Sequence, residues 1–251
     1  MAETILVTGA SAGFGQAICR RLVADGHRVI GAARRIEKLQ ALHEELGEAF
    51  YPLQMDVTDL TQVDQALSSL PADWEQIDVL VNNAGLALGL APAQKAETAD
   101  WLTMIQTNII GLTYLTRQIL PQMVERNDGY VINMGSTAGT VPYPGANVYG
   151  ASKAFVKQFS LNLRADLAGK QIRVTNIEPG LCEGTEFSAV RFKGDEKRVE
   201  ALYRDAHAIQ PEDIANTVSW LIQQPKHVNV NRIEIMPVSQ SFGPQPVYRG
   251  D

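Results

Sequence analysis

The sequence predicts a single-domain α/β protein built on a doubly wound parallel sheet with helices on both faces. Short β-branched or apolar runs alternate with longer amphipathic stretches along the chain, as in repeated βαβ units. The runs are almost entirely apolar, as expected when right-handed crossover helices cover both faces of the sheet. The chain has 251 residues and no linker or internal repeat, so residues 1–251 fit one domain.

The apolar runs predict about seven strands. They are Ile5–Val7, Arg28–Ala33, Tyr51–Met55, Val79–Val81, Tyr130–Met134, Ile172–Ile177 and Ile233–Met236. The intervening stretches are predicted to be helical, most clearly 16–22 and 147–163. The segment 179–195 is too long for an ordinary connection, which predicts a functional or mobile substrate loop. Residues 237–251 form a C-terminal tail.

Composition excludes several classes of protein. A net charge of -6 and a pI near 5.3 argue against broad nucleic-acid or anionic-membrane binding. No apolar run approaches a membrane span, which predicts a cytoplasmic protein. The two cysteines, Cys19 and Cys182, make no disulfide framework, and the four histidines have no metal-ligand spacing. We therefore expect no metal site.

A glycine-rich turn between the first predicted strand and the first helix predicts a phosphate-binding site. Gly9, Gly13 and Gly15 let the backbone approach a pyrophosphate, which the N–H groups at the following helix start would bind. Their spacing differs from the general G-x-G-x-x-G fingerprint, which is therefore not claimed. The alternative is an ordinary glycine turn.

Arg34 and Arg35 stand at the end of the second predicted strand, where an NAD enzyme would carry an acidic residue for the ribose 2′-hydroxyl. Two guanidinium groups suit a 2′-phosphate and therefore predict NADP(H) as the cofactor. The alternative is a pair of solvated charges at the start of an exposed helix.

Tyr149 and Lys153 are four residues apart in a predicted helix and therefore share one face. Alone, this spacing also fits an interfacial Tyr beside a solvated Lys. Here it comes after, in order, the glycine turn, residues 82–85 and residues 135–136. This combination resembles the short-chain dehydrogenase/reductase family from Val7 to about Pro237, which implies a Rossmann-type fold.

The resemblance implies four catalytic residues. Tyr149 would be the general acid or base, Ser136 would hydrogen-bond the carbonyl or alkoxide, and Lys153 would bind the ribose and activate Tyr149. A nearby ammonium favours a phenolate, so we expect the pKa of Tyr149 to fall toward working pH. Asn108 would hold a water that links Lys153 to solvent, unless it only kinks its helix.

The resemblance also implies how NADP(H) is held. Asp56 and Val57 would lie near the adenine, and Pro179 and Gly180 near the nicotinamide, although Asp56 would equally suit a helix cap. The predicted cofactor-binding residues are Gly9, Ser11, Gly13, Phe14, Gly15, Arg34, Arg35, Asp56, Val57, Asn83, Ala84, Gly85, Tyr149, Lys153, Pro179, Gly180 and Thr185.

The substrate loop carries Arg191 and Lys193, which suggest an acidic substrate, although a solvated basic patch is almost as good an interpretation. Arg249 would contribute only if the tail folds back. Glu183 departs from the pattern, and we favour its pairing with Arg191 or Lys193 or its exposure to solvent. The predicted substrate contacts are Ser136, Tyr143, Asn147, Tyr149, Glu183, Arg191 and Arg249.

Within the family, residues 83–89, 184–188 and 236–241 are similar to bacterial NADP-dependent 3-hydroxy acid dehydrogenases, which act on serine, allo-threonine and short semialdehydes. This implies a small anionic aldehyde or hydroxy-acid substrate. The similar sulfoacetaldehyde reductases are an alternative, and a non-catalytic NADP-binding sensor or scaffold is a second. The family also implies a homo-oligomer, either a tetramer or a dimer, formed through the helix that carries Tyr149 and its neighbour.

Overall fold

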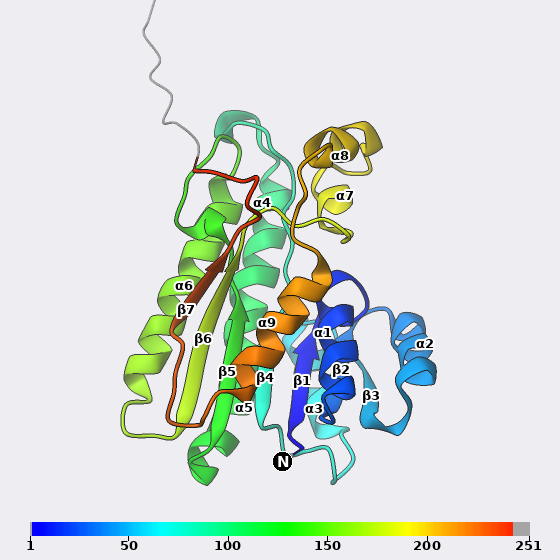
Figure 1. Ribbon diagram of the computed structural model, residues 1–251, viewed down its shortest axis with the longest axis vertical. Coiled ribbons are helices and arrows are strands. Elements are labelled where there is room, and N and C mark those ends of the chain that lie inside the picture. Colours follow the sequence, from blue (N-terminus) through cyan, green and yellow to red (C-terminus); the bar gives the residue numbers. More distant parts are fainter. Residues whose placement is uncertain (1, 243–251) are drawn as a thin grey trace, which may run out of the picture.

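The computed structural model describes residues 2–242, which contain one seven-stranded sheet (Figure 1). All strand pairs are parallel, and the spatial order is β3-β2-β1-β4-β5-β6-β7. The order reverses between β1 and β4, and ligands of such sheets bind beyond the carboxyl ends of the strands at this switch. The strands are β1 (Thr4–Thr8), β2 (Arg28–Ala33), β3 (Phe50–Gln54), β4 (Val79–Asn82), β5 (Gly129–Met134), β6 (Ile172–Pro179) and β7 (Arg232–Ile235).

Helices cover both faces of the sheet, so the predicted fold class is confirmed. Helices α1, α2 and α9 pack on one face, and α3, α5 and α6 pack on the other. The short helices α7 and α8 lie above the carboxyl ends of the strands (Figure 1). The helices are α1 (Gly13–Ala24), α2 (Ile36–Leu46), α3 (Leu60–Ser68), α4 (Thr98–Ile105), α5 (Leu112–Arg126), α6 (Asn147–Asp166), α7 (Phe187–Arg191), α8 (Glu196–Tyr203) and α9 (Pro211–Gln223).

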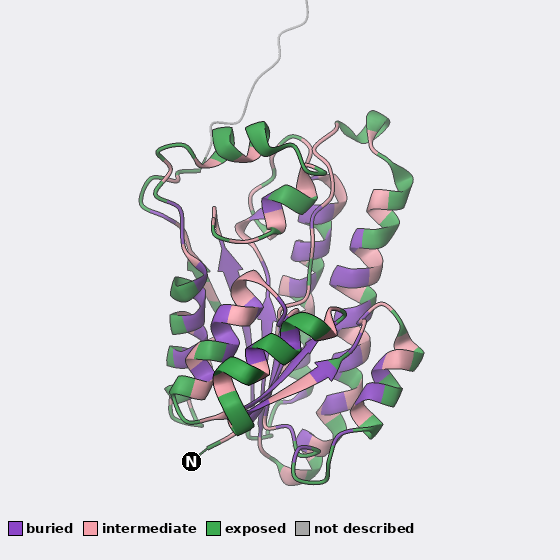
Figure 2. Ribbon diagram, turned by 90° about the vertical axis from the view of Figure 1, so that its right-hand side faces the viewer, coloured by how far each residue is buried: buried purple, intermediate pink, exposed green. Residues whose placement is uncertain are grey.

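Alternation along the strands divides the core into two layers. In β1, Ile5 and Val7 pack under α1 and α9, whereas Leu6 packs on the opposite face with α3 and α5. The central strands are therefore buried on both sides, as Figure 2 shows, and this explains their unbroken apolar sequences.

Two segments differ from the expectations drawn from the sequence. The predicted loop 179–195 is not irregular throughout, because it contains α7, and α8 comes directly after it. Between α4 and α5, a π-helical segment, η3 (Gln106–Gly111), contains Asn108. Three short 3₁₀ turns complete the elements: η1 (Gly47–Ala49), η2 (Ala93–Lys95) and η4 (Thr137–Gly139).

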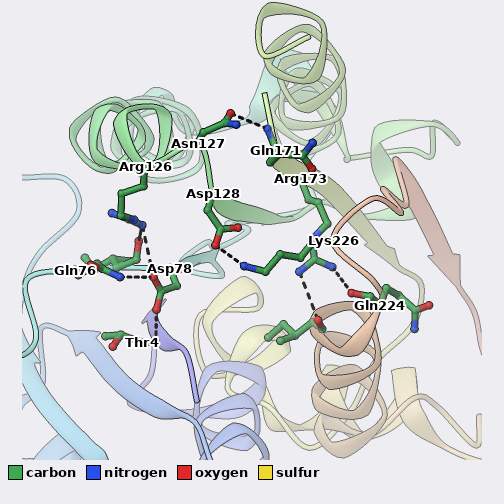
Figure 3. Close-up of polar contacts among 12 residues, drawn as sticks. Thr4, Gln76, Asp78, Arg126, Asn127, Asp128, Gln171, Arg173, Gln224 and Lys226 are labelled. Carbon is green, nitrogen blue, oxygen red and sulfur yellow. Dashed lines mark hydrogen bonds and ion pairs between the residues drawn. The ribbon is translucent and has the colours of Figure 1, made fainter. Parts of the chain in front are cut away.

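A network of polar side chains closes the amino end of the sheet (Figure 3). Asp78 accepts a hydrogen bond of 2.9 Å from the backbone N–H of Thr4 and pairs with Arg126 at 3.6 Å. Arg173 is buried and donates to the backbone carbonyls of Leu221 and Gln224 at the end of α9. This end of the sheet is thereby fixed, and the ligand cavity lies at the other end.

Within residues 2–242, no helix combines the length and the apolar character that crossing a membrane requires.

Candidate active site

A cavity of about 620 Å³ lies at the carboxyl ends of the strands. Its walls come mainly from the loops after β1 to β6, together with α7, the beginning of α6 and the end of α8. This volume falls within the range of cofactor and ligand sites, about 300 to 1,000 Å³. The position is the one that the strand order predicts.

The loop after β1 forms a cradle at one side of the cavity. Gly13 begins α1 with φ +52°, a conformation that favours glycine. A Cβ on Gly15 would lie 2.3 Å from the carbonyl oxygen of Gly9, so only glycine fits this close turn. The first turn of α1 has no acidic residue and no side-chain cap. Its N–H groups therefore suit an anion such as a pyrophosphate.

Arg34 and Arg35 line the same cavity at the end of β2. Arg35 donates hydrogen bonds from Nε and Nη2 to Ser11 Oγ, at 3.3 and 3.0 Å. The guanidinium of Arg35 is therefore held toward the glycine loop. Two cations beside this cradle fit the 2′-phosphate of NADP(H), so the residues present accommodate the cofactor that the sequence predicts.

The structure brings Ser136, Tyr149 and Lys153 together on the opposite wall of the cavity. Tyr149 and Lys153 lie one turn apart on α6, and both side chains are buried. Lys153 Nζ donates to the carbonyl of Met134 at 2.8 Å and lies 5.9 Å from the centre of the Tyr149 ring. Ser136 caps η4 by accepting a hydrogen bond of 3.1 Å from the N–H of Ala138. A hydroxyl, a phenol and an amine thus converge on one space.

The direction in which the pKa of Tyr149 shifts is opposite to the prediction. Burial raises the pKa of Tyr149 to about 12, and a hydrogen bond with Ser136 and the charge of Arg191 offset only part of this rise. Burial also lowers the pKa of Lys153 to about 8, because the ammonium is removed from water. Burial, which the prediction from the neighbouring ammonium left out, is the largest cause of the shift in both groups.

Asn108 does not line the cavity. Its side chain donates to the carbonyl of Leu86 at 2.9 Å and to Ser152 Oγ at 3.0 Å, and it accepts from the N–H of Leu86 at 3.0 Å. These bonds fasten η3 to the loop after β4 and to α6. They fit the helix-kinking alternative, and the predicted water relay stays a prediction.

Arg191 lies beside the predicted catalytic tyrosine. Its guanidinium carbon is 5.4 Å from the centre of the Tyr149 ring, and Nη2 donates to Tyr143 Oη at 2.8 Å. Phe187 packs against Tyr149 from the same helix, α7, with ring centres 5.7 Å apart. A cation, two phenols and an aromatic ring therefore bound the substrate end of the cavity.

Two of the predicted substrate contacts do not line the main cavity. Glu183 accepts a hydrogen bond of 2.6 Å from Gln210, and Lys193 pairs instead with Asp100. The expected pairing of Glu183 with Arg191 or Lys193 is not formed among residues 2–242, and the alternative, exposure to solvent, holds in part because Glu183 is half-buried. Neither Glu183 nor Asn147 lines the main cavity. The Asn147 side chain accepts from Trp101 Nε1 at 3.1 Å and thereby joins α6 to α4. Arg249 lies outside the described residues.

Of the predicted cofactor contacts, all except Gly15 line the cavity, and Gly15 is buried behind Gly9. The sequence alone did not point to Glu186, Phe187 and Gln240, which also line it. Glu186 and Phe187 fall within the predicted substrate loop, and their neighbour Thr185 was recognised. Their own contacts are with residues distant in sequence, and no local pattern reveals such contacts.

Comparisons with known proteins give a consistent result. The family model described as short chain dehydrogenase matches residues 3–196. The chain is similar to a probable NADP-dependent dehydrogenase of Haemophilus influenzae, with 60% identity over 95% of both chains. It is 59% identical to the NADP-dependent 3-hydroxy acid dehydrogenase YdfG of Salmonella typhi, over 98% of this chain and 99% of that one. A solved structure described as the closed form of serine dehydrogenase complexed with NADP+ has a TM-score of 0.97, with 57% identity, and covers 98% of this chain and 100% of its own.

Proposed function

Because the chain belongs to the short-chain dehydrogenase family, we propose that it is an NADP(H)-dependent oxidoreductase that interconverts a short acidic hydroxy compound with its aldehyde or ketone. The observation that carries the proposal is one continuous cavity with Arg34 and Arg35 at one end and Ser136, Tyr149 and Arg191 at the other. Relatives named for NADP-dependent activity on 3-hydroxy acids and serine support both the cofactor and the acidic substrate.

The proposed chemistry divides between the two ends of the cavity. The cofactor, when bound, supplies or accepts the hydride. Ser136 and Tyr149 hydrogen-bond the substrate oxygen, and these bonds strengthen as negative charge develops on that oxygen during reduction. Tyr149 then gives its proton to the oxygen, or takes one from it in the oxidative direction. Lys153 binds the ribose and keeps a positive charge near Tyr149.

Arg191 determines the proposed substrate class. Its guanidinium projects to the ring of Tyr149, close enough to pair with an acidic group two or three bonds from the reacting carbon. A carboxylate is favoured over a sulfonate because the similar proteins are named for hydroxy acids and serine.

The test combines substrates and variants. In an NADPH oxidation assay, malonic semialdehyde should be reduced faster than sulfoacetaldehyde, and both faster than neutral aldehydes. Tyr149→Phe should retain NADPH binding but lower the rate of reduction by about 10²-fold or more, since general acid catalysis contributes about 10² to 10⁴. A preference for neutral aldehydes would reject the acidic substrate. Unchanged turnover in the Tyr149→Phe variant would reject the mechanism.

The proposal includes a homo-oligomer formed through α6 and its neighbours. Phe155 on α6 is 38% exposed and stacks on Phe159, with ring centres 5.9 Å apart. Leu102 on α4 is 61% exposed. Large apolar side chains on packed neighbouring helices suit a symmetric contact with a second copy. We also propose a cytoplasmic location, since both cysteines are free thiols, as is usual in reducing compartments.

A further inference from the structure

The segment after β6 crosses the mouth of the cavity and is attached on both sides. On the substrate side, Lys193 pairs with Asp100 of α4 at 2.8 Å, and the N–H of Gly89 donates to the carbonyl of Arg191 at 3.0 Å. On the cofactor side, the attachment is made by Glu186, which immediately precedes α7.

Glu186 binds two cations at the beginning of α2. Its carboxylate accepts hydrogen bonds from Arg35 Nη1 at 3.1 Å and Nη2 at 2.8 Å, and from Lys38 Nζ at 2.9 Å. The bidentate geometry is the strong form of a carboxylate–guanidinium pair. Hydrogen bonds from Arg35 and Lys38 lower the pKa of Glu186 to about 2, so the carboxylate is ionised at any working pH.

These contacts occupy most of Arg35. A guanidinium has five N–H groups, and those of Arg35 serve Ser11 through Nε and Nη2 and Glu186 through Nη1 and Nη2. The guanidinium of Arg34, the preceding residue, has no hydrogen-bond or ion-pair partner among residues 2–242. The two arginines are therefore not equivalent: Arg34 is available to a 2′-phosphate, whereas Arg35 is engaged by the loop.

The position of Glu186 matters because α7 begins at the next residue. Helix α7 has five residues, so it spans only about 7.5 Å at 1.5 Å per residue. Over this length it carries Phe187, which packs on Tyr149, and Arg191, whose guanidinium also faces Tyr149. A contact that fixes the start of α7 therefore also limits where these two side chains lie.

We propose that Glu186 is a positioning residue, which holds α7 over the cavity through its contacts with Arg35 and Lys38. In this position α7 places Phe187 and Arg191 against Tyr149. Because Glu186 engages Arg35, recognition of the 2′-phosphate falls to Arg34. This rests on the proposed function for the identity of cofactor and substrate. The ion pairs of Glu186 are exposed to solvent, so they contribute little to the stability of the fold. They favour the closed position of the segment over an open one.

The first test needs neither cofactor nor turnover. Trypsin needs an extended backbone around its cleavage site, so cleavage after Arg191, the last residue of α7, requires local opening and its rate reports that opening. Glu186→Gln should increase that rate by up to about fivefold, which corresponds to about 1 kcal/mol. Glu37→Gln is the matched control, because it removes the same charge from the first turn of α2. Equal rates in the two variants would overturn the proposal.

The second test uses cofactor release, monitored by fluorescence. Glu186→Gln should accelerate the release of NADPH and NADH by the same factor and raise KM for the acidic carbonyl more than it lowers kcat. Arg34→Gln should weaken the binding of NADPH and leave the binding of NADH unchanged. If Glu186→Gln instead bound NADPH more tightly and NADH equally well, Glu186 would be a competitor of the 2′-phosphate, and the proposal would be wrong.

Charge reversal completes the design. Glu186→Lys should open the segment further, because the new cation would face Arg35 and Lys38. For this variant the opening is followed by chymotrypsin cleavage after Phe187 or Phe192, since the new lysine is itself a trypsin site. Adding Lys38→Glu to that variant should restore slow cleavage, since the ion pair is rebuilt in the opposite sense. Lack of rescue would count against the pairing. The cleavage and cofactor-release readouts do not depend on Tyr149, so failure of the proposed chemistry would leave those two interpretable.

Discussion

Tyr149 and Arg191 form a pair whose consequences extend beyond substrate binding. Tyr149 is buried, which keeps its phenol protonated and available as an acid in reduction. The oxidative direction needs the phenolate, whose negative charge is stabilised by the hydrogen bond from Ser136 and by the cation of Arg191. Tyr143 and Cys182 act in the opposite direction, because a negative charge on either would disfavour the phenolate. One side chain of α7 therefore affects both the substrate and the catalytic proton.

Arg191→Met should shift the pH dependence of oxidation. Without the guanidinium, the pKa of Tyr149 rises further, so the alkaline rise in kcat/KM for hydroxy-acid oxidation should move to higher pH. KM for the acidic substrate should increase by more than about tenfold, because a charged hydrogen bond contributes about 1.5 to 3 kcal/mol. Arg191→Lys is the control and should keep most of the profile. An unmoved profile in the Arg191→Met variant would show that this cation does not tune Tyr149.

At the scale of elements, a feature can be predicted from the sequence when its cause is local in the chain, as it is for a buried strand. The central strands were predicted closely, because burial on both faces leaves an apolar run that no other element of that length requires. The residue that caps α3 was not predicted. The cap is Asp59, which accepts a hydrogen bond of 3.1 Å from the N–H of Gln62, whereas Asp56 accepts from the N–H of Thr58. Two acids three residues apart are both plausible caps, and only the backbone path distinguishes them.

The segment η3 is a second feature that the sequence alone could not predict. Asn108 has no partner close in sequence, and its bonds reach Leu86, 22 positions earlier, and Ser152, 44 positions later. The π-helical turn that directs the side chain to both is a consequence of packing. Sequence reasoning could therefore recognise Asn108 by resemblance and still leave its role between a proton relay and a kinked helix.

Asn108→Ala distinguishes these roles. The substitution leaves the N–H and carbonyl of Leu86 without partners, which should lower the free energy of unfolding by about 1 to 3 kcal/mol. In a chain of this size, each kcal/mol lowers the Tm by about 2 to 4 °C. Thr113→Ala is the control, because its hydroxyl bonds only to carbonyls of its own helix region. A variant that keeps its Tm but loses kcat would contradict the structural role and favour the relay.

For the whole molecule, one end of the sheet carries the ligand cavity and the other end contributes to the stability of the fold. The carboxyl end carries the cavity and the attached segment, whereas the amino end is fixed by the polar network of Figure 3. Arg173 joins β5 and the end of α9 at this end of the sheet. It stacks over Tyr130, with the guanidinium carbon 4.0 Å from the ring centre, and it binds carbonyls at the end of α9. The sequence places Arg173 in a strand, but what it caps lies 48 or more positions away.

Arg173→Met should therefore destabilise the fold without altering the chemistry. The substitution keeps apolar contact with Tyr130 but leaves the carbonyl of Gln224 without its partner. The carbonyl of Leu221 keeps only the backbone N–H of Gln224, and a cation is removed from the negative end of α9. We expect the urea unfolding free energy to fall by about 3 kcal/mol at fixed protein concentration, with kcat unchanged below the transition, since Tyr149 lies at the opposite end of the sheet. Lys226→Met removes only an exposed pair with Asp128 and should cost less than about 1 kcal/mol. Equal losses in the two variants would show that Arg173 acts as a surface charge, and a lower kcat in the Arg173→Met variant would show that the base of the sheet is coupled to the cavity.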